Sequence, residues 1–250
     1  MLFVHGIPTS GRLWDYVVPA FKDKFMCVVV DLPGTGESPP LPGGVLDPDA
    51  CAQALDQLRQ HLSIPLWHIV GHDAGATIAV HYAARFGTRV HKLVLCSPPI
   101  FPEFKVPWFF QIMRTPVIGE CVGPLMMVLL WRVGLPSTIK YRDASTPQII
   151  RAFHRPFTGY RGLQQFLRLL RWGEPSQVLA QTAQLLQTLR VPTLVIHGKA
   201  DGIIPLSFAT RAAMSIPGAE LYIMECNHFL PLSCPEALCT RMLRFFDPIV

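Results

Sequence analysis

Short apolar runs alternate with helical patterns along most of this 250-residue chain. Runs that are rich in Val, Ile and Leu and bounded by Gly and Pro are typical of strands in a parallel sheet covered on both faces. The alternation predicts an α/β fold, with a mostly parallel open sheet, helices on both faces and chemistry at the carboxyl ends of the strands. We expect helices over 47–62, 74–86 and 235–246, and strands over 1–5, 26–31, 66–71, 92–96, 193–197 and 220–224.

The alternation stops between residues 97 and 176, where Pro, Trp and helical apolar patterns prevail and no strand is evident. We predict a helical cap over residues 98–175, inserted into a core formed by residues 1–97 and 176–250. The most apolar stretch, Cys121 to Trp131, is about 11 residues long, whereas a membrane span needs about 20. We therefore expect a buried or lid helix and no stable membrane insertion, with contact at a membrane surface as the alternative.

Charge and cysteine content limit which partners, compartment and metal sites we expect. The net charge is +5, but Lys and Arg are scattered, so we expect no nucleic-acid site. Seven cysteines without a C-x-x-C motif or a visible signal peptide predict reduced thiols in a cytoplasmic protein. The spacing of Cys226, His228, Cys234 and Cys239 fits no usual ligand pattern, so no metal is expected. The sequence does not predict the oligomeric state.

One turn places a carboxylate where a nucleophile is expected. The apolar run at 66–71 leads into Gly71-His72-Asp73-Ala74-Gly75 and then into a run of small residues typical of a helix start. The better-known form of this corner is G-x-S-x-G, which exposes a serine on a strained turn. We predict that Asp73 is a nucleophile and does more than cap the following helix.

Other segments end at the same expected edge of the sheet. A tight H-G-x-P turn ends the first strand and can aim the backbone N–H of Ile7 into the site. With the N–H of Ala74 it is expected to form an oxyanion hole. Asp201 follows the fifth strand and His228 the sixth, so the chain order is nucleophile, acid, histidine. We predict that Asp73, Asp201 and His228 form a catalytic triad.

These motifs and their order resemble the α/β-hydrolase fold superfamily over nearly the whole chain, and the loop at residues 31–38 is also typical of it. An Asp at the elbow resembles the haloalkane dehalogenase and epoxide hydrolase branch, and residues 5–10 and 114–120 lean toward the dehalogenases. The resemblance implies a small hydrophobic substrate and no cofactor. The chain begins at what is usually the third strand, so we expect either a sheet without the first two strands or a start that lies upstream.

The chain also departs from both subfamilies. Dehalogenases usually carry a halide-binding Trp directly after the nucleophile, and many carry Asn in the H-G-x-P turn, where this chain has Ala74 and Ile7. Epoxide hydrolases usually present two cap tyrosines to the epoxide oxygen, but Leu167 stands where one is expected. The candidate substrate contacts in the cap are Trp108, Tyr141 and Tyr160.

A carboxylate at the elbow changes the reaction, because Asp is already ionised at neutral pH and needs no base for its attack. Attack on an ester carbonyl would give a mixed anhydride that reverts, whereas attack on a saturated carbon gives an alkyl ester. His228, oriented by Asp201, would then activate water to hydrolyse that ester. We predict a haloalkane dehalogenase-like hydrolase, with an epoxide hydrolase as the alternative. A non-catalytic ligand-binding protein on this scaffold, or a cofactor-free lyase or oxygenase using His228, is an alternative from another class.

Overall fold

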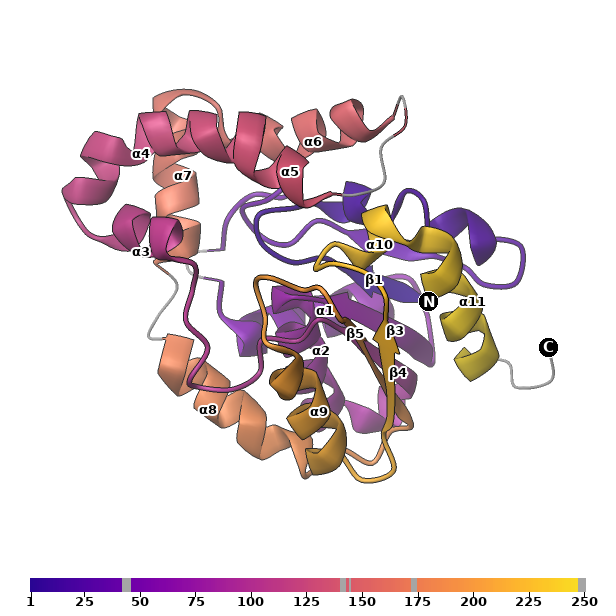
Figure 1. The fold of residues 1–250 in the computed structure, drawn as a ribbon. Coiled ribbons are helices and arrows are strands. Elements are labelled where there is room, and N and C mark those ends of the chain that lie inside the picture. The colour runs from indigo at the N-terminus through magenta and orange to yellow at the C-terminus, as the bar shows by residue number, and fades with distance from the viewer. Residues whose placement is uncertain (42–45, 140–142, 144, 172–174, 247–250) are drawn as a thin grey trace.

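Parallel strands form one six-stranded sheet at the centre of the molecule (Figure 1). The computed structural model describes residues 1–41, 46–139, 143, 145–171 and 175–246. The strand order is β2-β1-β3-β4-β5-β6, and every neighbouring pair is parallel. The strands are β1 (Leu2–Val4), β2 (Val28–Val30), β3 (Trp67–His72), β4 (Val90–Cys96), β5 (Thr193–Gly198) and β6 (Glu220–Met224). The predicted sheet is confirmed. β4 begins two residues early because Val90 pairs with Trp67 across an irregularity in register.

Helices cover both faces of this sheet, as adjacent residues of β3 demonstrate. The Trp67 ring lies 5.7 Å from the ring of Tyr82 on one face, whereas the His68 ring lies 4.7 Å from the ring of Phe246 on the other. The first face carries α1 (Pro48–His61), α2 (Ala74–Arg85), α8 (Pro175–Leu186) and α9 (Leu206–Ser215), which contact one another in that order. The second face carries α11 (Pro235–Phe246), preceded by the short α10 (Leu230–Ser233).

The described part of residues 98–175 is helical and contains no strand. These helices gather at one end of the molecule in Figure 1, above the core. They are α3 (Trp108–Arg114), α4 (Ile118–Leu129), the π-helical η4 (Leu130–Gly134), α5 (Leu135–Thr138), α6 (Thr146–His154) and α7 (Gly159–Leu170).

The apolar stretch expected at 121–131 belongs to a longer helix. Residues Ile118–Thr138 run through α4, η4 and α5 as 21 helical residues, which by length and composition alone are enough to cross a membrane. The expectation of a run too short to span is therefore corrected, because the helix continues past Arg132. Only a third of its most apolar window is buried.

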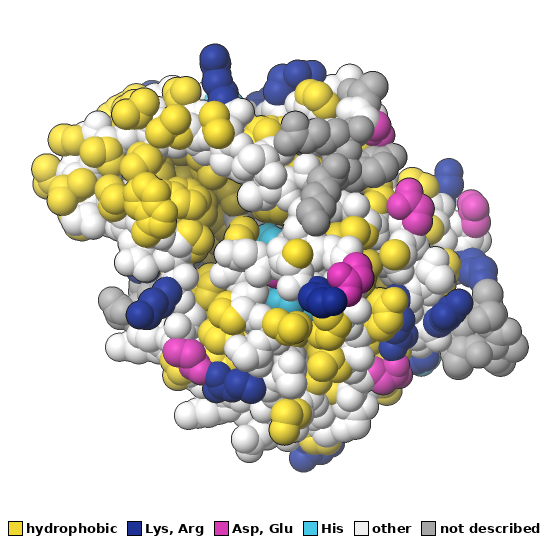
Figure 2. All heavy atoms as spheres, in the orientation of Figure 1, with side chains coloured by type: hydrophobic (Ala, Val, Ile, Leu, Met, Phe, Trp, Pro, Cys, Tyr) yellow, Lys and Arg dark blue, Asp and Glu magenta, His cyan; other side chains and the backbone are white. Residues whose placement is uncertain are grey.

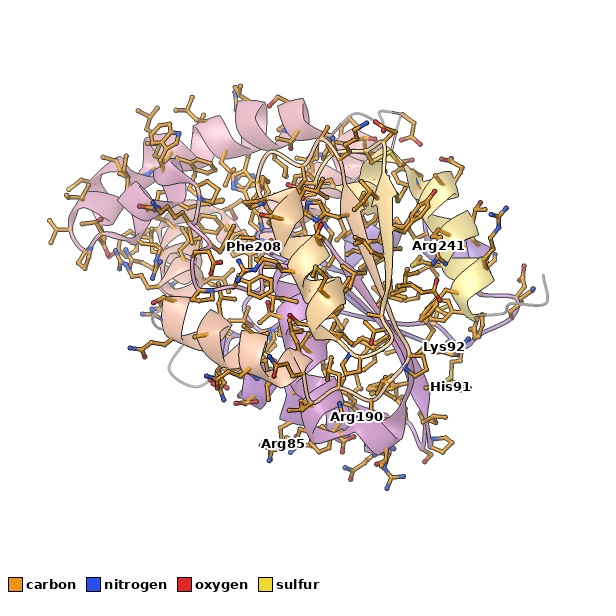
Figure 3. The ribbon with its side chains drawn as sticks, turned by 60° about the horizontal axis from the view of Figure 1, so that its bottom comes forward. Arg85, His91, Lys92, Arg190, Phe208 and Arg241 are labelled. Atoms are coloured by element: carbon orange, nitrogen blue, oxygen red, sulfur yellow. A yellow bond between two sulfur atoms is a disulfide. The ribbon has the colours of Figure 1, made fainter. Side chains whose placement is uncertain are left out.

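Basic side chains lie at the opposite end of the sheet. Arg85, His91, Lys92 and Arg190 lie at the end of the molecule away from α3 and α4 (Figure 3). The Lys92 ammonium donates to the Phe245 carbonyl at 2.7 Å and so ties β4 to the last turn of α11. The candidate site lies at the carboxyl ends of the strands, beneath the helices of 98–175.

Candidate active site

The turn between β3 and α2 holds Asp73 in a strained backbone conformation. Its φ is +53°, in a region of backbone conformation that residues other than Gly rarely adopt. Its backbone N–H donates to the Cys96 carbonyl at 3.0 Å, which fixes the turn to β4. A Cβ on Gly71 would lie 2.5 Å from the Gly75 oxygen, and one on Gly75 would lie 2.4 Å from the His5 oxygen. The glycines of the motif are therefore required by close backbone contacts.

The two oxygens of the Asp73 carboxylate have different surroundings. Oδ1 accepts hydrogen bonds from the backbone N–H of Ala74 at 2.6 Å and of Ile7 at 3.2 Å. These are the two donors predicted for the oxyanion hole. Oδ2 lies 3.8 Å from Nε2 of His228. Burial raises the pKa of Asp73, while the charge of His228 and the two backbone donors act in the opposite direction.

His228 is held by Asp201, as the chain order predicts. Nδ1 of His228 lies 2.9 Å from Oδ2 of Asp201, and the Asp201 side chain is fully buried. Its Oδ1 accepts from the backbone N–H groups of Ile203 and Ile204 at 2.8 and 2.9 Å, which fixes the carboxylate. Burial favours neutral forms, but this hydrogen bond and charge pairing outweigh it, so the pKa of Asp201 is lowered and that of His228 is raised.

An apolar cavity of about 460 Å³ opens at Asp73 and His228. Trp108 lies in its wall, as expected of a substrate contact, and is also 68% exposed. The structure does not bring Tyr160 to this cavity, since its side chain is 77% exposed and lines cavities elsewhere on α7. Tyr141 lies outside the described residues. Other wall residues include Phe104, Pro107, Phe109, Leu130, Leu135 and Phe229.

A family model described as the alpha/beta hydrolase fold matches residues 1–233. The chain belongs to this family. That membership confirms the fold inferred from the motifs and is consistent with a hydrolase. Fold does not select a reaction, however, so the choice of an Asp nucleophile depends on the site itself.

Relatives of this α/β hydrolase carry different names. A pimeloyl-[acyl-carrier protein] methyl ester esterase from Vibrio atlanticus is 26% identical over 98% of this chain and 93% of its own length. The structure of haloalkane dehalogenase DbeA from Bradyrhizobium elkani is 24% identical, with a TM-score of 0.83 over 99% of this chain and 89% of that one. A meta-cleavage product hydrolase from Pseudomonas fluorescens is 21% identical, with a TM-score of 0.80 over 100% and 90%. The two structural likenesses show the fold alone.

Two buried histidines that the sequence reasoning missed position the site of this α/β hydrolase. Nε2–H of His72 donates to the backbone oxygen of His228 at 2.9 Å. Nε2 of His5 accepts from the Leu32 N–H at 2.9 Å, so its Nδ1–H donates to the Gly6 oxygen at 2.8 Å and holds the turn that carries Ile7. Burial lowers the pKa of His5 to about 4 and that of His72 to about 3. The sequence signal that could have identified them is their position, since His5 stands in the H-G-x-P turn and His72 in the G-x-D-x-G turn.

A disulfide joins Cys226 to Cys234, on either side of the segment that carries His228. The expectation that all cysteines are reduced thiols is wrong for this pair, because the chain folds the His228 loop and α10 back on each other. Cysteine content therefore no longer argues for a reducing compartment.

Proposed function

We propose that this α/β hydrolase displaces halide from a small haloalkane through an ester formed on Asp73. The observation that carries the proposal is the position of Oδ1 of Asp73, which accepts hydrogen bonds from both N–H groups of the predicted oxyanion hole. An ester substrate would need those donors for its own carbonyl oxygen. With the hole filled by Asp73, the oxygen that remains available is Oδ2, and its natural target is a saturated carbon.

The first step needs the ionised carboxylate and no base. Oδ2 of Asp73 attacks the carbon that bears the halogen, the new C–O bond forms as the C–halogen bond breaks, and halide leaves with the bonding electrons. The cavity supports this step, because a carboxylate with few water contacts is a stronger nucleophile than a hydrated one. Its apolar wall also fits a small alkyl group.

The second step uses His228 and Asp201. Nε2 of His228 takes a proton from water, and the water oxygen adds to the carboxyl carbon of Asp73. Negative charge then develops on Oδ1, which already accepts hydrogen bonds from the N–H groups of Ile7 and Ala74. The intermediate collapses by breaking the bond from that carbon to Oδ2. The alcohol leaves with Oδ2 and takes that proton back from His228. The water oxygen stays on Asp73 as a carboxylic acid hydroxyl, whose proton is released to solvent to restore the carboxylate.

The cavity lining favours a halide over an epoxide as the leaving group. An epoxide oxygen needs a proton donor such as a tyrosine hydroxyl, whereas a halide needs only N–H or O–H groups to solvate it. Among the described residues, the lining contains Trp108, whose indole carries an N–H, but no tyrosine. The hydroxyls of Ser137 and Thr138 also line the cavity, but they donate to the backbone oxygens of Gly134 and Leu135. Structural neighbours named as haloalkane dehalogenases are consistent with this choice.

Ester hydrolysis, the activity named for the Vibrio relative, is disfavoured by the same geometry. A carboxylate that attacks a carbonyl forms an anhydride, and an ester oxyanion would find the N–H pair occupied. The sequence likeness to that relative therefore supports the fold and a hydrolase. It does not bear on which residue is the nucleophile.

Mass spectrometry of trapped protein tests the proposal. His228→Gln should still be alkylated by 1-bromobutane, because attack needs no base, but it should stall before hydrolysis. The peptide carrying Asp73 should then be heavier by a butyl group in place of a proton. An epoxide probe would instead add its whole mass, so the two leaving groups are distinguished. In the wild type, one turnover in heavy-oxygen water should label the Asp73 carboxylate.

Asp73→Asn is the matched control and should be neither alkylated nor labelled. Normal product formation with an unlabelled Asp73 would contradict the proposal and indicate direct attack by water. Absence of turnover on haloalkanes, epoxides and esters alike would favour the ligand-binding alternative.

A further inference from the structure

An apolar face on the inserted helices is left uncovered. Figure 2 shows hydrophobic side chains gathered at the upper left, over α3 and α4, beside a hollow that leads to histidine side chains. Leu125 is 64% exposed and Val133 is 60% exposed, on the outward side of one helix. We define the apolar face as Trp108, Val117, Leu125, Val128, Leu129 and Val133. A contiguous exposed patch of this kind marks a contact site.

The inner side of the same helix is fixed in the fold. Met127 and Trp131 are buried, and α4 packs against α3 and α7. Glu120 on α4 receives two hydrogen bonds from Arg171, at 2.7 and 3.0 Å. Crossing a bilayer would break these contacts and carry the charge of Arg132, inside the helix, into hydrocarbon. Although Ile118–Thr138 is long enough to span, its packing suits it to lie along a surface.

The inserted segment that carries the apolar face has a net positive charge. Residues 98–175 hold ten of the 22 Lys and Arg residues but four of the 17 Asp and Glu residues, a net charge of +6, which leaves −1 on the rest of the chain. Arg132 and Arg151 are exposed and share a cavity with Val128 and Tyr160. Among the described residues, no carboxylate pairs with either arginine.

Apolar side chains with exposed arginines beside them match an anionic lipid surface. A second copy of this chain is a poorer match, because two such faces would bring like charges together. An acidic soluble partner would satisfy the arginines but leave little use for so many exposed aliphatic side chains.

The apolar face also adjoins the catalytic cavity. Trp108 belongs to both, and Leu130 and Gly134 of the same long helix line the cavity wall. A substrate dissolved in a bilayer would therefore meet the cavity without first crossing bulk water.

We propose that this face binds the surface of an anionic lipid bilayer, with Ile118–Thr138 lying in the interface. Apolar substrates that partition into the bilayer then enter the cavity beside Trp108. The binding goes beyond the proposed reaction and does not depend on it, so Asp73→Asn should bind vesicles as the wild type does.

Vesicle sedimentation tests the proposal. The wild type should sediment with phosphatidylcholine vesicles that contain about 30% phosphatidylglycerol, and less with pure phosphatidylcholine, because anionic lipid attracts the arginines. The double variant Leu125→Asp/Val133→Asp should reduce the bound fraction more than about tenfold. Met214→Asp, at an 82% exposed position on α9, is the matched control and should bind normally. Circular dichroism and thermal melting check that each variant folds.

Trp108 provides a second readout that sedimentation cannot mimic. Its fluorescence should shift to the blue on addition of anionic vesicles, and Trp108→Phe should remove that shift. Absence of vesicle binding by the wild type would overturn the proposal. The protein could instead bind soluble polyglutamate equally well with and without the Leu125→Asp/Val133→Asp change, and fail to bind vesicles. That result would assign the face to an acidic macromolecule. A dimer that this double variant dissociates, again without vesicle binding, would assign it to a second copy.

Discussion

Replacing Asp73 with serine is expected to turn this site from the proposed alkyl transfer to ester hydrolysis. The change removes Oδ1 from the N–H groups of Ala74 and Ile7, which it now occupies at 2.6 and 3.2 Å. It also leaves a hydroxyl within range of His228, whose Nε2 lies 3.8 Å from the present carboxylate. The oxyanion hole, the base and its Asp201 partner would then match those of a serine hydrolase.

The expected gain follows from the freed donors. One oxyanion-hole donor contributes roughly 3–4 kcal/mol, a factor of about 10²–10³ in turnover. Two donors become available, but the serine oxygen lies on a shorter side chain, so we expect the lower end of that range. Hydrolysis of p-nitrophenyl acetate should therefore rise at least about 100-fold over the wild type, while halide release from 1-bromobutane should fall to background.

Absorbance of p-nitrophenolate and a halide electrode measure the two activities. Asp73→Ala is the control, because it empties the hole in the same way but supplies no nucleophile. The reasoning would be refuted if the wild type hydrolysed the ester as fast as Asp73→Ser through a reaction that Asp73→Ala abolishes. In that case the carboxylate oxygen on the N–H pair does not exclude ester substrates.

Further expectations concern pH and stability. Turnover limited by ester hydrolysis should rise as His228 loses its proton, with a midpoint above the ordinary value of 6.5. Asp201→Asn should lower that midpoint and slow turnover roughly 10³-fold in a pH-rate profile. Gly75→Ala should cost about 1–3 kcal/mol in thermal melting through backbone overlap, whereas Gly202→Ala, with open space at its Cβ, should not. Because His5 stays neutral in the fold while the same residue of the unfolded chain binds a proton below pH 6.5, His5 alone should lower the free energy of unfolding by about 1.4 kcal/mol per pH unit from about pH 6 to 4.5. His72 should add to this slope in the same direction. Urea titration of His5→Gln should lack the part of the slope due to His5.

The core was readable from the sequence because its central strands are largely buried on both faces. All six residues of β5 are buried, and the strand appears in the sequence as the apolar run 194–196 between Pro192 and Gly198. The juxtaposition of Asp73, Asp201 and His228 was readable for a related reason. Parallel strands end at one edge, so residues that follow them meet there whatever their separation in the chain.

The contacts of the inserted helices were not readable, because they depend on how helices rotate against one another. Tyr160 was a candidate substrate contact, but α7 turns Leu163, Phe166 and Leu167 inward and leaves Tyr160 outside. The Cys226–Cys234 disulfide depends equally on a tertiary approach, of the His228 loop to α10. Residue type and spacing do not carry that information.

The filled N–H pair has a consequence for how such a chain is detected. Fluorophosphonate and sulfonyl fluoride probes report α/β hydrolases by reacting with an activated hydroxyl while their own oxygen occupies the oxyanion hole. This chain presents a carboxylate at the elbow and has Oδ1 of Asp73 already on both donors. A survey that counts hydrolases by such probes would therefore pass over this protein, even where it is abundant and correctly folded.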